Sequence, residues 1–408
     1  MGIFANPLTD LLEYEDFSRD FLKGTDPVGM TGCIDSEKVH FMSTFLGEKK
    51  VQLVVTYNEQ RAREIEEDYK LFCSQVYVIP PRDLIFFSAD LQGNAIIAER
   101  MKAFAALYQN EAKVIITTMD ALMSAAVPFE QLMSHVIKLK EGDELDLEKL
   151  KHDLTVMGYE RVGRVEEPGQ FTVHGGIADV YPLTMEVPVR IELWGDEIDT
   201  IRCFEPQSQR SMDQIECVSV FPAAEVIADD TARRRAAGMI QNELESQLAV
   251  FKKAKEPDKA KRLREETNRI LEALGEDVVL EAPDSYISYF YPRTVQLSEY
   301  FDEKNTLVFL DEPMRLKERG DGVQAEFEES MKNRLEQGFL LPGQTALLTP
   351  AKHVLAAFER GQVAALSSLD SRLADFTVVN SYAVNVQNMN TYREGFEPVS
   401  YTHLRAHE

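Results

Sequence analysis

Eight consecutive residues near the N-terminus have the spacing of a phosphate-binding loop. Such a loop has the form GxxxxGK[ST], follows a strand and wraps its backbone amides around the phosphates of a nucleotide. Gly29 keeps the first glycine of the motif, and Ser36 keeps its final hydroxyl. Between them, Thr31 and Gly32 keep a threonine–glycine pair. The glycine and the lysine of the sixth and seventh places are replaced by Ile34 and Asp35. The spacing therefore indicates nucleotide chemistry, but two of the residues that perform it are missing.

Both replacements oppose phosphate binding. Ile34 is β-branched, so it resists the positive φ that glycine permits, and its side chain obstructs the amide cradle. Asp35 places a negative charge where the lysine would reach the β- and γ-phosphates. Two like charges about 4 Å apart repel by roughly 4 kcal/mol at an effective dielectric constant of about 20. The sequence therefore predicts that this chain binds neither ATP nor magnesium and has no catalytic residue.

An acidic pair later in the chain has the form of the other half of an ATPase site. Asp311 and Glu312 follow the apolar run at 307–310, as the acids of a Walker B motif do. Many strands end in acids, so the pair alone could also lack a function. Beside the altered phosphate loop, we interpret the two acids as the remains of a nucleotide site whose scaffold has been kept.

The segment VPVRIELW has the alternation of a strand with two different faces. The core side is predicted to hold Val187, Val189, Ile191 and Leu193. The opposite face is predicted to hold Arg190, Glu192 and Trp194, the only tryptophan of the chain. Tryptophan and arginine are enriched at binding hot spots. The alternative is that Trp194 packs beneath a neighbouring loop while Arg190 pairs with Glu192.

Alternating helices and strands must position the nucleotide residues. Helices are predicted at 10–22, after Asn58 and at 95–108, and strands at 51–57, 76–80, 113–118 and 306–313. Strands separated by helices of this length imply parallel βαβ units. The predicted divisions are residues 1–130 and 220–395 for the two halves of one α/β domain, 131–219 for an inserted α+β domain, and 396–408 for a non-native tail.

Two long helices are predicted at the start of the second half. The first begins near Asp230, Pro257 ends it, and the second runs to residue 274 with Gly275 as its C-cap. We expect a connector rather than a coiled-coil dimer. In the inserted domain, a helix is predicted from about residue 147, capped by Asp146 or Asp143.

The composition limits what this chain can bind and where it can function. The formal net charge is -25, with 69 acidic against 44 basic residues, which disfavours direct binding along DNA. The sequence has no run of about 18 apolar residues, so no membrane span is predicted. The acidic N-terminus lacks the pattern of a signal peptide. The four cysteines lie far apart, without the spacing of a zinc site or a disulfide framework. These features predict a cytoplasmic protein with no structural metal.

Two sequence blocks carry a resemblance to a known family. GQFTVHGGIADVYP at 169–182 and VPVRIELWGDEIDTIRCFEPQSQRS at 187–211 resemble the region shared by UvrB and the transcription-repair coupling factors. The resemblance extends over residues 10 to about 395. Three features favour the coupling factors. The phosphate loop is degenerate, and there is no room between Thr118 and His135 for UvrB's DNA-clamping hairpin. The segments TTMDALMSAAVP and LVFLDEP also resemble the coupling factors.

The resemblance implies a degenerate RecA-like, P-loop NTPase-like domain with an inserted UvrB interaction domain that docks onto UvrA. Arg190 and Trp194 fall on family positions implicated in that contact, with Glu192 between them. His174 replaces a family arginine, and a partly protonated histidine there can still donate a hydrogen bond.

The resemblance also implies what the whole family protein does. It is an ATP-dependent translocase on double-stranded DNA that displaces stalled RNA polymerase, through modules beyond residue 408. The alternatives are a fragment of a working UvrB-like ATPase or helicase, and a structural module that restrains the missing motor.

Overall fold

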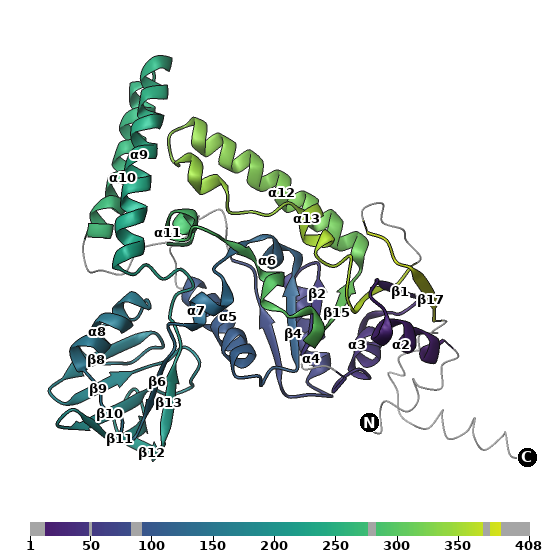
Figure 1. Cartoon of the computed structure of the whole chain (residues 1–408), viewed down its shortest axis with the longest axis horizontal. Helices are drawn as coiled ribbons and strands as arrows, with labels where there is room; N and C mark the ends of the chain where they lie inside the picture. The colour runs from purple at the N-terminus through teal and green to yellow at the C-terminus, as the bar shows by residue number, and fades with distance from the viewer. Residues whose placement is uncertain (1–12, 49–50, 83–91, 276–282, 370–375, 385–408) are drawn as a thin grey trace, which may run out of the picture.

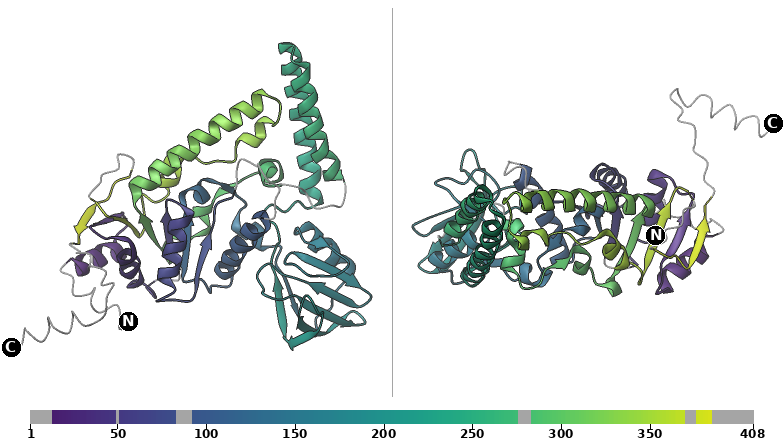
Figure 2. Two further views of the ribbon diagram at one scale, coloured as in Figure 1. Left: turned by 180° about the vertical axis from the view of Figure 1, so that it is seen from behind. Right: turned by 90° about the horizontal axis from the view of Figure 1, so that it is seen from above.

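A computed structural model describes residues 13–48, 51–82, 92–275, 283–369 and 376–384. Three parts are visible in Figure 1: a large α/β domain, a smaller β-rich domain and a long helical hairpin. The smaller domain and the hairpin lie at the same end of the α/β domain in both Figure 1 and Figure 2. The start of the first predicted helix and the predicted tail at 396–408 lie outside the described residues.

The α/β domain is built on one sheet of seven parallel strands, in the order β17-β1-β16-β15-β2-β4-β3. The strands are β1 (Val28–Thr31), β2 (Val51–Thr56), β3 (Val76–Ile79), β4 (Val114–Thr118), β15 (Thr306–Asp311), β16 (Val363–Ser367) and β17 (Asn380–Ala383). Every residue of β2, β4 and β16 is buried, as expected where both faces are covered. Because β1 and β15 are parallel, their carboxyl ends meet at one edge, which brings the two halves of the nucleotide motif together.

Three helices cover one face of this sheet: α2 (Tyr14–Lys23), α3 (Asp35–Ser43) and α4 (Glu59–Tyr69). Their aromatic side chains form a cluster against strand residues such as Val54 and Phe309. The cluster contains Phe17, Phe21, Phe41 and Phe45. Asn58 accepts a hydrogen bond from the Arg61 backbone N–H and caps α4, as its position in the sequence predicts.

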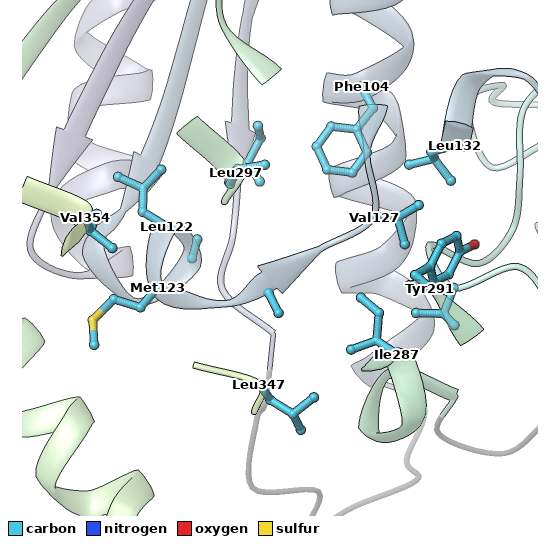
Figure 3. Packing of buried hydrophobic residues seen from close by; sticks show 14 of the residues in the cluster. Phe104, Leu122, Met123, Val127, Leu132, Ile287, Tyr291, Leu297, Leu347 and Val354 are labelled. Atoms are coloured by element: carbon cyan, nitrogen blue, oxygen red, sulfur yellow. The ribbon is translucent and has the colours of Figure 1, made fainter. Parts of the chain in front are cut away.

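Short elements and a long helix cover the opposite face. The helices are α5 (Gln92–Tyr108), α6 (Met119–Met123), α7 (Phe129–Met133), α11 (Ile287–Phe290), α12 (Pro313–Glu336) and α13 (Ala351–Ala356). The connecting elements are β5 (Ala125–Ala126) paired with β14 (Val295–Gln296), and 3-10 turns at Pro283–Tyr286, Leu297–Tyr300, Glu303–Asn305 and Pro342–Thr345. Figure 3 shows Phe104, Leu122 and Ile287, which are far apart in sequence, within one cluster of buried residues in this core. α6, β5 and α7 fill the segment between β4 and residue 135, where we expected no long hairpin.

The smaller domain contains a six-stranded sheet, a two-stranded ribbon and one helix. Its elements are β6 (Ile137–Lys140), α8 (Leu147–Val156), β7 (Glu160–Arg161), β8 (Gln170–His174), β9 (Ile177–Val180), β10 (Val189–Trp194), β11 (Glu197–Phe204), β12 (Ser211–Gln214) and β13 (Cys217–Val220). The sheet order is β12-β11-β10-β9-β8-β7, and β6 pairs with β13. α8, capped by Asp146, packs its buried Leu150 and Leu154 against one face of the sheet. On the opposite face, Val165 packs with Tyr181 and Phe204 in a separate small cluster.

A buried ion pair fixes the chain where it leaves this domain. The Arg100 guanidinium, on α5, donates to both carboxylate oxygens of Glu225 at 2.5 and 3.0 Å and to the Pro80 carbonyl at 2.6 Å. Arg100 and Glu225 are both almost fully buried. Both charges are therefore matched inside the protein, as a buried ion pair requires.

The helical hairpin consists of α9 (Asp230–Ala254) and α10 (Pro257–Gly275). Ala236, Ile240 and Leu244 are buried along one face of α9, which packs against α10 and α11. The two helices pair within one chain, and Pro257 begins the second, as predicted. Gly275 was predicted to cap α10 but is the last residue inside it, a difference of one position that is usual at helix ends.

The predicted fold class is confirmed: a parallel-sheet α/β domain with an inserted α+β domain. Within the described part of the chain, no helix combines the length and the apolar character needed to cross a bilayer.

Candidate functional site

The open face of the smaller domain's sheet carries the residues predicted for docking. Arg190 on β10 lies opposite Asp179 on β9 and Arg202 on β11. Glu192 lies opposite Ile177 on β9, and Ile177 lies opposite His174 on β8. Directly paired residues of neighbouring strands point to the same side of a sheet. These residues, with Trp194, therefore form one surface, which we call the docking face.

Arg190 is held rigidly on this face. Its Nε and Nη2 donate to the two oxygens of Asp179 at 2.7 and 2.8 Å. Its guanidinium carbon lies 4.8 Å from the ring centroid of Phe204, which is fully buried. The hydrogen bond to Asp179 raises the pKa of Arg190, so the side chain stays charged. The alternative pairing of Arg190 with Glu192 is wrong, because the Nε and Nη2 donate to Asp179 on the neighbouring strand instead.

Trp194 is the most exposed large apolar side chain among the described residues, at 84%. It ends β10 and lies opposite Glu197, just beyond a register shift between Glu192 and Leu193. The alternative in which Trp194 packs beneath a loop is therefore wrong. Val189 and Ile191 are fully buried behind it, so the strand that carries the indole is fixed by the domain core.

The remaining docking-face residues surround Trp194 unevenly. His174 is exposed at the end of β8, and Ile177 is 40% exposed at the start of β9. Glu192 is half-buried and accepts a hydrogen bond from the Thr200 hydroxyl at 3.3 Å. Sequence reasoning missed Asp179 and Ile177. The alternation of β9 could have found them, because both lie on its outward side.

The loop between β1 and α3 is shorter than the eight residues of the phosphate-loop motif. Gly29 and Thr31 belong to β1, and Asp35 and Ser36 are the first residues of α3. Only Gly32, Cys33 and Ile34 lie between the strand and the helix. The eight residues of the motif therefore span the end of the strand, a three-residue loop and the start of the helix.

Gly32 is enclosed by other parts of the chain. It has φ 86°, and its backbone N–H donates to the Ser367 carbonyl at 3.0 Å. A Cβ at this position would lie 1.9 Å from the Val384 carbonyl oxygen. Only glycine fits here, because a side chain would displace the backbone of β17's end. The amide is engaged within the protein, and the space beside it is filled.

Lys38, on the second turn of α3, neutralises the acidic pair. Its ammonium lies 2.7 Å from Asp311 and 2.6 Å from Glu312, and its side chain is 2% exposed. Asp311 is also buried and accepts from the Thr56 hydroxyl at 2.9 Å and the Arg61 Nε at 3.4 Å. Each polar group of this cluster therefore has an internal partner, as burial demands.

Glu312 is fixed by a further set of contacts. Besides Lys38, it accepts hydrogen bonds from the backbone N–H and hydroxyl of Ser368, at 2.8 and 2.5 Å. Burial raises the pKa of Glu312, but the hydrogen bonds from Lys38 and Ser368 outweigh it, so the net pKa lies below its usual range. Glu312 is therefore a carboxylate at neutral pH.

Asp35, the residue in the lysine position, forms no hydrogen bond with Asp311 or Glu312, and its charge acts on Arg61 instead. Its side chain is exposed, and its φ of 32° is one that L-residues rarely adopt. The Arg61 guanidinium donates to its backbone carbonyl at 3.0 Å. Glu312 also has a left-handed φ, 54°. Strained residues of this kind are common at functional sites. Over the described residues, no group of three or more histidine, cysteine or acidic side chains is placed to hold a metal ion.

The geometry of the docking face can be compared with known proteins. Residues 137–225 match the UvrB interaction domain family, and this range includes every docking-face residue named above. The residues at the carboxyl edge of the parallel sheet, Gly32, Lys38, Asp311 and Glu312, lie outside it.

The rest of the chain is also similar to known sequences. The chain is 30% identical over 343 residues to the transcription-repair-coupling factor of Bacillus subtilis, covering 82% of this chain. It is 30% identical over 348 residues to the protein of that name from a Staphylococcus epidermidis strain and 28% identical over 360 residues to that of a Staphylococcus aureus strain. These matches cover 84% and 85% of the chain. The chain spans 29% of the length of each of these relatives.

Proposed function

Because this chain belongs to the transcription-repair-coupling factor family and carries a UvrB interaction domain, we propose that it recruits UvrA through the docking face. In the whole protein, this contact would bring the excision-repair machinery to the place where a motor beyond residue 408 displaces stalled RNA polymerase from double-stranded DNA. The chain itself would supply the contact and no catalysis.

The exposed indole of Trp194 is the observation that carries this proposal. A tryptophan that is 84% exposed leaves a large apolar surface in water, which a partner can cover. Its strand is fixed from behind by Val189 and Ile191, so the side chain is presented without the cost of ordering a loop. Aromatic anchors on rigid supports are typical centres of binding energy.

Arg190 supports the same surface in two ways. Its Nε and Nη2 bind Asp179, which fixes the direction of the guanidinium plane. Its Nη1 has no hydrogen-bond partner among the described residues, and 21% of the side chain is exposed. The free N–H groups can therefore donate to an acceptor on UvrA beside the tryptophan. A donor that is already oriented loses less entropy on binding.

We also propose that the chain binds no nucleotide. A magnesium nucleotide needs free amides in the loop and free carboxylates at the end of β15. Here the Gly32 amide is bonded to Ser367, the Val384 carbonyl lies against the loop, and Lys38 occupies the space between Asp311 and Glu312. The residues present do not fit a magnesium nucleotide, since Lys38 already supplies the positive charge beside Asp311 and Glu312.

Fluorescence tests the proposed recruitment directly. Trp194 is the only tryptophan of this chain, so its emission can be followed if the tryptophans of UvrA are first replaced by phenylalanine. We expect addition of UvrA to move the emission to shorter wavelength, because the indole passes from water into an interface. Binding without any change in emission would place the contact elsewhere on the chain and contradict the docking face.

A further inference from the structure

The free end of the helical hairpin is basic, in contrast to the rest of the chain. We define the hairpin tip as residues 252–264, which the structure describes in full and which span the end of α9 and the first turns of α10. The tip holds seven lysines and arginines against two acids, whereas the chain as a whole has a net charge of -25. Its basic residues are Lys252, Lys253, Lys255, Lys259, Lys261, Arg262 and Arg264.

Most of these charges are free. Lys252, Lys253, Lys255 and Arg264 are exposed and form no ion pair with any described residue. Lys261 is 76% exposed and lies 3.8 Å from Glu265, at the limit of an ion pair. Pairs of this kind contribute little in water. The tip therefore presents at least four uncompensated positive charges to solvent.

The backbone beneath these charges is held in place. Phe251 and Leu263 are buried. Arg262 stacks on Phe339 at 4.6 Å and donates to the Gln337 carbonyl at 2.8 Å, which joins the tip to the end of α12. The exposed lysines and Arg264 thus extend from a braced surface rather than from a loose loop.

Stabilisation of the helices does not account for so many basic residues. Lys252 and Lys253 in the last turn of α9 do oppose the negative end of its macrodipole. Lys261, Arg262 and Arg264, however, lie beyond the first turn of α10, where the macrodipole contributes little. Their positive charges are therefore not explained by the helix ends.

We propose that the hairpin tip binds the phosphate backbone of duplex DNA. Over residues 249–264, Phe251 is buried and Val250 is the one large apolar side chain that is well exposed, while Arg262 stacks on the neighbouring Phe339, which is 45% exposed. Lysine is depleted at the centres of protein interfaces, whereas lysines and arginines that replace phosphate counterions supply most of non-specific DNA affinity. The composition of the tip therefore fits a polyanion better than a folded protein surface.

The position of the tip also favours this partner. At about 1.5 Å per residue, the 25 residues of α9 extend roughly 37 Å, and Figures 1 and 2 show the hairpin projecting from the body. Charges are screened over about 8 Å at physiological ionic strength. Most of the acidic body therefore lies beyond screening distance of the tip, and the end of α12, which contacts Arg262, is the part of the body near it.

Titration of a labelled duplex against salt concentration tests this proposal. We expect the parent chain to bind at about 50 mM salt with an affinity that falls steeply as salt rises, and to bind weakly at about 150 mM. The triple variant Lys252→Gln, Lys253→Gln, Lys255→Gln should bind about tenfold or more weakly at the lower salt. It should also reduce the slope of log affinity against log salt by up to about 2.7, because each lost phosphate contact removes about 0.9.

A matched variant controls for net charge. Lys149→Gln, Arg161→Gln, Arg360→Gln removes three exposed charges elsewhere on the chain and should leave the affinity and the slope nearly unchanged. Equal losses in the two variants, an unchanged tip variant, or no duplex binding by the parent chain at low salt would overturn the proposal. Tip-dependent binding of polyglutamate without duplex binding would instead assign the tip to an acidic protein. UvrA binding is measured separately and tests only the docking face.

Discussion

At the scale of single residues, the partners of each charge determine what it does. Asp35 stands where a phosphate loop has lysine, but its side chain faces solvent. Lys38, one turn later, supplies the positive charge and directs it to Asp311 and Glu312 rather than to a phosphate. Arg190 is likewise both a surface group and the partner of the buried Asp179. Substitutions at Lys38 and Arg190 should therefore affect stability, unlike most surface changes.

Lys38→Met should destabilise the chain by about 3 kcal/mol, because it leaves Glu312 without its ion-pair partner and Asp311 with only the more distant Arg61 as a charged partner. Urea unfolding measures this, with Lys149→Met as the exposed control, which should change little. Asp311→Asn should then cost less in the Lys38→Met background than in the parent. Strict additivity of the two substitutions would show that the pair does not interact.

Arg190→Ala should destabilise the smaller domain by about 2 kcal/mol, because the Asp179 carboxylate is left without its main partner. Trp194→Ala should leave thermal unfolding unchanged, since the indole is 84% exposed. Thermal scans of the two variants compare them directly. Loss of stability in Trp194→Ala but not in Arg190→Ala would contradict both predictions and show that Trp194, not Arg190, supports the fold.

Acid should weaken the Glu312 contacts. The folded-state pKa of Glu312 lies below its ordinary value of 4.5, so its contribution is present above that value and is lost as the pH falls through the lowered pKa. Unfolding free energies measured from neutral pH down through about pH 4 should therefore fall less steeply in Glu312→Gln than in the parent. Parallel curves for the two proteins would contradict this contribution.

At the scale of elements, local patterns were predictive and long-range ones were not. Buried strands, the caps at Asn58 and Asp146 and the break at Pro257 all follow from nearby residues, and the structure confirms them. The order of the seven strands depends on pairings between distant segments and could not be derived in this way. The Lys38 contact was missed for the same reason, since its partners lie more than 270 positions away.

The docking face shows the same division. Strand alternation correctly placed Arg190, Glu192 and Trp194 outward and Val189 and Ile191 inward. It could not identify Asp179 as the partner of Arg190, because the register between β9 and β10 depends on the turn and the core together. A residue's side of the sheet was therefore predictable, and its contacts were not.

The carboxyl edge of the parallel sheet should bind no nucleotide. Calorimetric titration of the chain with magnesium ATP is expected to give no heat of binding, because Lys38 and the Val384 carbonyl occupy the space that the metal and the phosphates need. A UvrB with an intact phosphate loop serves as the positive control. A micromolar dissociation constant for this chain would contradict the prediction.

At the scale of the whole molecule, three functions are assigned to three parts. The parallel-sheet domain is a scaffold closed by its own ion pairs, the smaller domain presents the docking face, and the hairpin holds its basic tip away from an acidic body. The chain covers 29% of the length of the relatives it matches. UvrA recruitment is the proposed function that can be tested with this chain alone.

The affinity of UvrA for Trp194→Ala tests that central claim most directly. A tryptophan anchor at an interface centre contributes at least about 2 kcal/mol, so the substitution should weaken binding by roughly 30-fold or more. Leu71→Ala is the matched control, because Leu71 is 77% exposed on the parallel-sheet domain and should leave the affinity unchanged. Calorimetry at equal salt measures both. A folded Trp194→Ala chain that binds UvrA as tightly as the parent would show that the docking face does not make the contact.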